Sequence, residues 1–557
     1  MTEQAYDVIV IGSGAGGLAA AVPLAQAGQK VLVVEQHYVP GGWCHSFTLE
    51  GYRFSPGVHY IGGLGPGGPM RKIYEGLGVS GELAFCEINP DGYDHIIIGD
   101  QRFDIPKGRE EYAQRLIDRF PHERKGIEGY LKFLDDIMDE IDNLSKFRFK
   151  KHWWKLPFEA STTLRWGTQS IQKVLDRYVS DPLLKAILTA QAGDHGLPPS
   201  MVSAPVHAAI SHHYLDGAYY PLGGGFAIPR AFTRVLKENG GELLLDTKVE
   251  RILIENQQAV GVRLAGGKEI RARHVISNAD PEVTFGKLVG REKLSRKLIR
   301  KLDKVTYSTS AISLFMAVDM DLREAGFDSG NYWYYRHQDL EEIYRQGLGS
   351  HSLHSEQPSA MFLTVTTLKD PTKLHSGHHT LEAFTFVAYD EFKEWVHAHE
   401  DQRPADYAAL KDVLTQRMIN MADEIIPGLR DHVVFSDLGT PLTNEHYLNS
   451  TQGNLYGIAK SRFQVGPLAF PVATEIEGLW MCGASTLGHG VAGATASGLA
   501  AAARILHCRT ADLLKQAGPP LEVYPSEDPD AWPARLRRRI KRGQSAAHED
   551  PASLETV

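Results

Sequence analysis

The sequence predicts an α/β protein of at least two domains, and three observations support this fold class. A chain of 557 residues and 61.7 kDa exceeds what one hydrophobic core usually supports. Near its start, at residues 6–35, an apolar strand, a glycine-rich turn, a helix and a second strand follow one another. Near its end, at residues 479–505, a short strand runs through a glycine-rich loop into a helix of small residues. Together these patterns predict a Rossmann-like nucleotide-binding domain joined to a second domain.

The N-terminal βαβ unit carries the clearest motif. Gly12, Gly14 and Gly17 form G-x-G-x-x-G between the strand YDVIVI and a helix that runs to about residue 27. The first glycine permits the tight turn, the second lets a pyrophosphate approach the backbone, and the third lets helix and strand pack closely. Free N–H groups of the first helical turn, which includes Ala15 and Gly16, then receive the phosphate charge.

An acidic residue closes the second strand of this unit. Glu35 lies 35 − 17 = 18 residues beyond the last glycine of the motif. A carboxylate there accepts hydrogen bonds from a ribose diol and disfavours a 2′-phosphate. The motif and Glu35 together therefore predict a dinucleotide cofactor.

Composition narrows the class of protein further. The formal net charge of −9 opposes a general role in nucleic-acid binding. Four scattered cysteines form no C-x-x-C pair and no disulfide framework, which fits a reducing compartment. We find no uncharged apolar run of eighteen residues and no signal-peptide pattern. We therefore expect a cytoplasmic protein, with membrane contact confined to its periphery.

The segment GGWCHSFTLEGYRFSPGVHYIGG, residues 41–63, raises the choice between a metal site, a redox thiol and a cofactor wall. We expect a hairpin over residues 43–54, in which the adjacent Cys44 and His45 point to opposite faces of a strand. No further ligand sits at a recognised spacing, so no metal site is predicted. A wall of the cofactor pocket is the favoured interpretation.

This segment also carries a family resemblance. The glycine pair Gly41 and Gly42 after the acidic strand resembles the flavoprotein superfamily of phytoene desaturases, carotenoid isomerases and amine oxidases. The text GGWCHSF followed by GVHYIG is similar to retinol saturases, although Trp43 stands where those enzymes carry the first cysteine of a pair. GDHGLPPSMVSAPVHAAISHHYLDGAYYPLGGGF and ARHVISNADP extend the resemblance over most of the chain.

The resemblance implies FAD as the cofactor and a discontinuous FAD domain. Residues 1–70, 223–285 and 450–510 would form the FAD domain, 71–222 and 286–449 a mixed α+β substrate domain, and 511–557 a C-terminal tail. In the resembling superfamily Gly41 and Gly42 lie along the diphosphate, and the position of Val249 lies near the adenine. The C-terminal glycine loop covers the flavin there, which makes its residues expected FAD contacts: Gly483, Ala484, His489, Gly490 and Val491.

The resemblance further implies an oxidoreductase that acts on a C=C bond of a conjugated polyene isoprenoid, a retinoid or carotenoid, and saturates it with hydride from reduced flavin. One alternative is a carotenoid cis-trans isomerase or desaturase on the same fold, and another is a non-catalytic lipid-binding escort protein. No second dinucleotide motif follows a strand, so the electron donor is left open. The expected proton donors or substrate-orienting groups are His59, Tyr60, His45, His213 and Tyr214.

Three segments suggest how the protein could meet a lipid-like substrate. Aromatic side chains such as Trp333, Tyr334 and Tyr335 suit an apolar tunnel, although aromatics of this number are also ordinary core. HWWKLPFEASTTLRW at residues 152–166 suits either a surface that dips into a bilayer or a buried contact between domains. The basic run ARLRRRIKRGQ at residues 534–544 is typical of a solvated, mobile end, and it also suits an anionic membrane surface.

Overall fold

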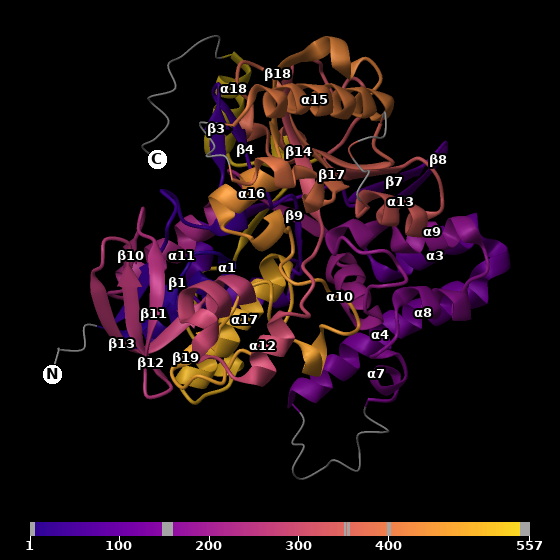
Figure 1. The fold of residues 1–557 in the computed structure, drawn as a ribbon. Helices are drawn as coiled ribbons and strands as arrows, with labels where there is room; N and C mark the ends of the chain where they lie inside the picture. The colour runs from indigo at the N-terminus through magenta and orange to yellow at the C-terminus, as the bar shows by residue number, and fades with distance from the viewer. Residues whose placement is uncertain (1–5, 147–159, 350–352, 354–356, 398–402, 546–557) are drawn as a thin grey trace.

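The structure is a computed structural model that describes residues 6–146, 160–349, 353, 357–397 and 403–545. Two seven-stranded sheets organise these residues, and a four-stranded sheet lies in addition to them. Figure 1 shows the first large sheet on one side of the molecule, a helical cluster on the other, and the second large sheet above both. Within the described ranges, no helix combines the length and apolar character needed to cross a membrane.

The first sheet is built around the predicted βαβ unit. Its strands β1 (Tyr6–Ile11), β2 (Val31–Val34) and β13 (Glu269–Ser277) run parallel, with β1 between the other two. Strands of this kind are buried on both faces, which explains the unbroken apolar text. The other strands are β10 (Glu242–Leu244), β11 (Val249–Glu255), β12 (Gln258–Leu264) and β19 (Leu479–Met481).

Three helices cover one face of this sheet. The helix α1 (Ala15–Gln26) packs against α11 (Ala227–Glu238) and most closely against α17 (Gly490–Ile505). In Figure 1 the indigo α1 lies beside the yellow α17, although they are more than 450 residues apart in sequence. A Cβ at Gly498 would overlap the carbonyl oxygen of Gly16, so only glycine permits this approach.

The other face of the first sheet is covered by a π-helix, η6 (Glu282–Gly290), and by α12 (Arg296–Leu302). Leu288 and Leu302 belong to the same apolar cluster as Ile9 and Val249 of the sheet. The domain boundary expected at residue 285 therefore falls inside a packed segment.

The second sheet has the order β18-β14-β17-β16-β15-β7-β8. Its members are β7 (Asp94–Ile98), β8 (Gln101–Ile105), β14 (Ser310–Val318), β15 (Asn331–Tyr335), β16 (Ala360–Val365), β17 (His379–Val387) and β18 (Val433–Gly439). The helix α15 (Ala405–Ile425) covers one face through residues such as Met418 and Met421. Flanking this sheet are α13 (Leu340–Gly347), α14 (Thr366–Lys369) and α16 (Pro441–Leu448).

A smaller sheet links the two large ones. It has the order β20-β6-β9-β5, with β5 (Ile61–Gly62), β6 (Ala84–Glu87), β9 (Ala218–Pro221) and β20 (Glu522–Pro525). Further helices are α2 (Pro69–Gly76), α3 (Arg109–Arg119), α4 (Arg124–Lys146), α7 (Ser161–Trp166), α8 (Ile171–Tyr178), α9 (Pro182–Thr189) and α10 (Ala204–Tyr214).

The prediction of a solvated C-terminal tail is wrong for residues 522–545. The strand β20 pairs parallel with β6, and Trp532 is only 1% exposed and donates its Nε1–H to the Pro525 carbonyl over 2.7 Å. The basic run forms the helix α18 (Ala534–Ser545), which buries Leu536 and Ile540. These two residues are four apart and share one helix face, so the apolar stripe outweighs the surrounding arginines.

Candidate cofactor and active site

The glycine motif forms a turn with almost no room for side chains. Gly12 adopts a φ of +89° at the end of β1, and a Cβ at Gly17 would overlap the Gly12 carbonyl oxygen. A Cβ at Gly14 would lie 2.7 Å from the Asn278 amide nitrogen, and one at Gly16 would lie 2.6 Å from the Asn278 amide oxygen. Gly12 is therefore required by its backbone angle, and Gly14, Gly16 and Gly17 are required by close approaches.

Asn278 is a site residue that sequence reasoning did not single out. It follows β13 directly, and its backbone N–H donates to the Ile11 carbonyl over 2.9 Å. Its amide also lies 2.9 Å from where a Cβ of Gly483 would stand, so it touches both glycine loops. The sequence offers only its place in the segment ARHVISNADP. The structure adds that this segment ends a parallel strand, where the carboxyl ends of neighbouring strands meet.

Glu35 is buried at the end of β2 and is held by the glycine loop. Its Oε2 accepts hydrogen bonds from the backbone N–H and the hydroxyl of Ser13, at 2.9 and 2.7 Å. Its Oε1 accepts from the His37 backbone N–H at 2.9 Å. A carboxylate has about four acceptor positions, so capacity for a further hydroxyl donor is left.

A cleft opens along this edge of the sheet. Its walls include five residues expected to bind the cofactor, Gly12, Gly14, Glu35, Gly42 and Val249. The end of α16 adds residues from beyond the first sheet, Tyr447, Leu448 and Asn449, which the sequence did not reveal.

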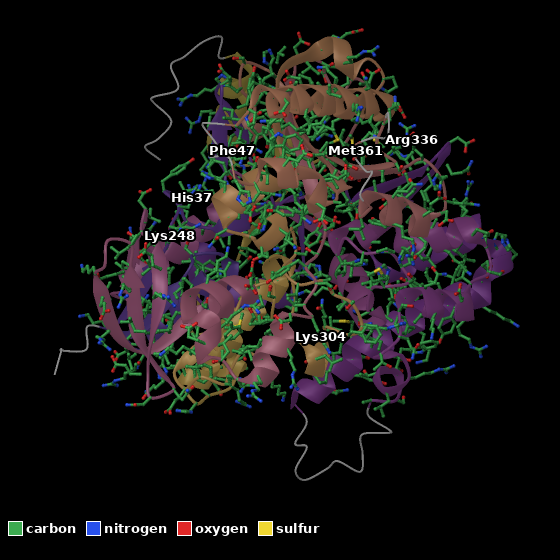
Figure 2. The ribbon with its side chains drawn as sticks, viewed as in Figure 1. His37, Phe47, Lys248, Lys304, Arg336 and Met361 are labelled. Carbon is green, nitrogen blue, oxygen red and sulfur yellow. The ribbon has the colours of Figure 1, made fainter. Side chains whose placement is uncertain are left out.

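His37 contributes an unpaired nitrogen to this cleft. Its ring stacks on Tyr38 at 4.4 Å and lies 5.6 Å from the Tyr447 ring. Figure 2 shows His37 between the first sheet and α16. Its Nε2 is buried and has no hydrogen-bond partner within the part of the chain that the structure describes. A buried polar atom without a partner is costly, so a polar ligand in the cleft would satisfy it.

His45 also lines this cleft, but its local structure differs from the expectation. Residues Gly42–Cys44 form a 3₁₀ turn, and the His45 Nδ1 bonds to the Gly42 carbonyl at 2.7 Å. The positive φ angles of Gly41 (+125°) and Gly42 (+54°) start this turn, so no strand alternation sets Cys44 against His45. The predicted hairpin begins only at Phe47, as β3 (Phe47–Leu49) and β4 (Tyr52–Phe54).

Cys44 and His45 raised the possibility of a redox thiol or a metal site, and the structure supports neither. Burial raises the pKa of the Cys44 thiol to about 12, which suppresses its thiolate at neutral pH. Burial also lowers the pKa of His45 to about 4, so the imidazole is neutral. Among the described residues, no group of three His, Cys, Asp or Glu could hold a metal ion.

The C-terminal glycine loop lies beside the N-terminal one. Gly483 adopts a φ of +89° after β19, and its N–H donates to the Ser497 hydroxyl at 2.8 Å. The Ala484 carbonyl accepts from the buried Lys460 ammonium at 2.5 Å. Gly490 and Val491 open α17. Backbone groups of both glycine loops therefore border the same region, as expected for a cofactor that spans them.

His489 connects this loop to the substrate side of the molecule. Its Nε2–H donates to the Asp194 carbonyl at 2.8 Å, and its ring lies 5.3 Å from Tyr456. Burial lowers the pKa of His489 to about 3, so the ring is neutral. The side chain therefore fixes the loop against the segment η5 (Ala190–Asp194).

Tyr60 lies at the centre of a buried polar cluster. Its hydroxyl donates to Asp194 Oδ2 at 2.8 Å and lies 3.4 Å from Asp94 Oδ2. Asp94 is fully buried and accepts from the amides of Gln191 (2.8 Å) and Asn331 (2.9 Å). Two carboxyl groups from segments a hundred residues apart thus meet at one phenol, a contact that the sequence could not show.

His59 occupies the neighbouring position and faces a different partner. Its Nε2 lies 3.2 Å from Glu382 Oε2, and its ring is 5.1 Å from Phe362. The His59 carbonyl accepts from the buried Lys369 ammonium at 2.7 Å. Lys369 also donates to the Asn331 amide oxygen at 2.5 Å, which ties this lysine to the Asp94 cluster.

The two remaining expected catalytic residues come from the end of α10. The His213 Nε2 accepts the Gly62 N–H at 2.9 Å, and burial lowers its pKa to about 4. This hydrogen bond fixes β5 against α10, which is a structural role. The Tyr214 ring instead stacks on Tyr60 at 4.3 Å and belongs to the buried cluster.

Aromatic rings surround this polar cluster. The Trp333 ring lies 4.6 Å from Phe362, and Phe362 stacks on Phe384 at 4.8 Å. Trp166 is buried beside Phe133, at 6.3 Å, and both residues lie in the predicted substrate domain, so this contact is not one between domains. The tryptophans at 153 and 154 lie outside the described residues.

Comparison with known proteins identifies the family. The chain matches the flavin-containing amine oxidoreductases over residues 15–506. The chain belongs to this family. It is 31% identical to the all-trans-retinol 13,14-reductase of Danio rerio, across 90% of this chain and 86% of that protein. It is 28% identical to the chloroplastic prolycopene isomerase of Arabidopsis thaliana, across 90% and 83%.

Solved structures show the same fold. An oxidoreductase from Methanosarcina mazei gives a TM-score of 0.58 at 18% identity and covers 89% of this chain and 99% of that chain. A putrescine oxidase gives a TM-score of 0.58 at 16% identity, across 90% and 99%. The predicted family and fold class are confirmed, and the protein is a flavin-dependent oxidoreductase.

The residues of the cleft fit a flavin dinucleotide. Gly12, Gly14 and Gly42 line the cleft with backbone that carries no side chain, as the close approach of a diphosphate requires. Glu35 retains acceptor capacity for a ribose hydroxyl, and His37 presents a buried nitrogen with no partner. Together these groups would hold the nucleotide half of the cofactor, and the loop at Gly483 would border the flavin half.

Proposed function

We propose that the protein binds FAD and saturates one C=C bond of a conjugated polyene isoprenoid, a retinoid or carotenoid. The observation that carries this proposal is that an aromatic wall, formed by Trp333, Phe362 and Phe384, is connected by hydrogen bonds and ring contacts to the C-terminal glycine loop. His489 of that loop bonds to Asp194, and Asp194 bonds to Tyr60, whose ring lies 6.5 Å from Phe362. The similarity to a retinol reductase and to a prolycopene isomerase over 90% of the chain supports a polyene substrate.

FAD is favoured over a mononucleotide flavin by the cleft beyond the glycine turn. A mononucleotide has no ribose diol for Glu35 and nothing to reach Val249 or Tyr447, which line the same cleft. Flavin released from the purified protein and separated by chromatography should therefore be FAD, and FMN would contradict this assignment.

When bound, the reduced flavin supplies a hydride to one carbon of the double bond. The protein's own side chains orient the polyene, exclude water and supply a proton to the second carbon. Aromatic rings such as Trp333, Phe362 and Phe384 offer flat apolar surface to a conjugated chain. Beside them, the amides of Gln191 and Asn331 satisfy Asp94, whereas the buried Trp333 Nε1 has no hydrogen-bond partner among the described residues.

The mass of the product tests the proposed reaction. Reduced enzyme is mixed with all-trans-retinol or prolycopene without oxygen, and the product is analysed by mass spectrometry. A gain of two hydrogens supports saturation. An unchanged mass with altered double-bond geometry would instead establish the isomerase, and loss of two hydrogens by the oxidised enzyme would establish a desaturase. Bound polyene with no product and no flavin would support the lipid-binding escort protein.

We also infer contact with a membrane surface as the source of this substrate. Phe463 is 68% exposed and lies under the Arg462 guanidinium, and Leu164 is 62% exposed and precedes Arg165 in the sequence. Such pairs suit an interface in which apolar side chains enter the lipid and cations meet anionic headgroups. Co-flotation with anionic vesicles should be lost on Phe463→Ser with Leu164→Ser, and unchanged flotation would contradict this inference. The cytoplasmic location stays a prediction.

A further inference from the structure

We propose that Asp194 is the catalytic acid that protonates the substrate, and that Asp94 and Tyr60 hold it ready to do so. This inference rests on the proposed reduction of a C=C bond. It assigns a role to a residue outside the five expected from the sequence. Three structural features support it: the place of Asp194, the unequal surroundings of the two carboxyl groups, and the hydrogen bond from Tyr60.

Asp194 lies between the C-terminal glycine loop and the aromatic wall. Its carbonyl is held by His489, which caps the N-terminus of α17. Its side chain points instead to Tyr60, whose ring stacks on Tyr214. Asp194 keeps part of its surface accessible, whereas Asp94 is fully buried. Of the two residues, Asp194 is therefore the one with surface that a bound molecule can touch.

The two carboxyl groups have different surroundings. Asp94 accepts hydrogen bonds from the amides of Gln191 and Asn331, which favour its ionised form. Asn331 in turn accepts from Lys369, so a cation lies behind Asp94. Asp194 has no such amide donors to its side chain among the described residues, and its carboxyl group accepts a hydrogen bond from the Tyr60 hydroxyl.

This difference separates the pKa values of the pair. Burial, together with the nearby Asp94 carboxylate, raises the pKa of Asp194 to about 8. Burial raises the pKa of Asp94 to about 6, and the bonds from Asn331 and Gln191 oppose that rise. At neutral pH Asp94 is mostly ionised and Asp194 is mostly protonated. Neighbouring carboxyl groups with separated pKa values are the pattern expected of a general acid beside a charged partner.

The other ionisable groups that face Asp194 stay neutral near pH 7. Burial raises the pKa of each facing phenol, and the pKa of His489 is about 3. Asp94 is therefore the charged group nearest to Asp194, and behind it lies Lys369, whose pKa burial lowers to about 7, so that its ammonium is only partly charged at neutral pH. The facing phenols are those of Tyr60, Tyr93, Tyr214, Tyr335, Tyr344 and Tyr456.

The reduction needs one hydride and one proton for each double bond. Hydride addition to one carbon breaks the π bond and leaves its electron pair on the second carbon. That carbon takes the proton of Asp194, so a new C–H bond forms at each carbon and the flavin loses two electrons. Asp194 is left as a carboxylate, and the Tyr60 hydroxyl donates a charge-assisted hydrogen bond to it. Tyr60 thus stabilises the product of the transfer and is a positioning residue.

The test compares Asp194→Asn, which keeps the shape and an acceptor for Tyr60, with Tyr60→Phe and with Asp100→Asn on an exposed turn. All variants are purified with flavin, and unchanged flavin absorbance shows that the site is folded. Reoxidation of the dithionite-reduced enzyme by all-trans-retinol is followed by stopped flow from pH 5 to pH 10. Loss of a general acid typically costs about 10²–10⁴-fold in rate.

We expect the wild-type rate to fall above about pH 8, as Asp194 ionises. Asp194→Asn should be slowed at least about 100-fold and should lack this ionisation. Tyr60→Phe should move the ionisation to higher pH, since the carboxylate loses a hydrogen bond. Asp100→Asn should match the wild type. A wild-type rate and pH profile in Asp194→Asn would overturn the assignment while leaving the reductase function intact.

Infrared spectroscopy provides a readout that is independent of turnover. The resting enzyme should show a protonated carboxyl stretching band that titrates near pH 8 and is absent from Asp194→Asn. If this band is missing from the wild type, Asp194 is not a stored acid and the inference fails, whatever the substrate. If the band is present but no polyene reoxidises the flavin, the proposed function fails and this inference falls with it.

Discussion

Replacing Gly16 by alanine tests whether the two glycine loops must meet without side chains. A Cβ at this position would lie 2.8 Å from the Gly483 backbone nitrogen and 3.0 Å from the Ala494 carbonyl oxygen. Comfortable separations are about 3.5 Å, so these groups must withdraw by about 0.7 and 0.5 Å at the same time. Both are backbone atoms of the loop and helix that border the flavin half of the cleft.

The magnitude follows from two opposing effects. Alanine favours a helix interior over glycine by about 0.5–1 kcal/mol, and this advantage is smaller in the first turn, where Gly16 lies. Overpacking a close contact costs about 1–3 kcal/mol. Because two backbone groups must move together, the clash prevails, and we expect a net loss of about 2 kcal/mol in the free energy of unfolding. FAD affinity should fall about tenfold or more, since Gly483 and Asn278 are displaced.

Two measurements decide this prediction. Urea unfolding of the flavin-free protein gives the change in stability, and quenching of FAD fluorescence gives the dissociation constant. Gly439→Ala is the matched control, because a Cβ there meets its nearest atom at an ordinary 3.6 Å. Gly16→Ala with wild-type stability and wild-type FAD affinity would refute the account of how α1 and α17 meet.

Three further perturbations have expected outcomes. Trp532→Ala should lower the free energy of unfolding by about 3–5 kcal/mol, because it leaves a buried cavity. The control Arg538→Ala, on the exposed face of α18, should stay within about 0.5 kcal/mol of wild type. Equal urea midpoints for the two variants would contradict docking of the C-terminal segment. Glu35→Gln should weaken FAD binding about 10- to 100-fold by fluorescence titration, because hydrogen bonds to a charged group contribute about 1.5–3 kcal/mol, and unchanged affinity would remove Glu35 from the site. The pKa of buried His213 is lowered to about 4, so the folded state binds fewer protons than the unfolded state between pH 4 and the ordinary value of 6.5. Stability from this group is therefore present above pH 6.5 and is lost as the pH falls toward 4; His213→Gln should flatten this dependence in urea unfolding, and an unchanged slope would argue against a buried neutral ring.

Much of the cofactor domain could be predicted because its signals are local. The βαβ unit, the short strand at 479–481 and the helix of small residues that begins at Gly490 all lie where periodicity and glycine placement predict them. Each depends on neighbours within a few residues. The hairpin at 47–54 also depends on a local feature, because Glu50 and Gly51 both adopt the positive φ of a tight turn.

The site itself depends on contacts that no local pattern encodes. Asp94, Asp194 and Tyr60 meet only because β7, η5 and the residue before β5 converge. Asn278 gains its role from two glycine loops that are distant in sequence. The prediction of a solvated C-terminal end is wrong for a related reason. The high charge of the segment dominates its composition, whereas its position depends on the burial of Trp532 and on strand pairing with β6.

The most direct test of the central claim is an anaerobic visible spectrum of the holoenzyme, reduced with dithionite and then mixed with one equivalent of all-trans-retinol. The account predicts that the oxidised flavin bands return while the polyene band shifts to shorter wavelength, one double bond being lost for each flavin reoxidised. A flavin that stays reduced while the polyene spectrum changes, or that responds to no polyene, would contradict it.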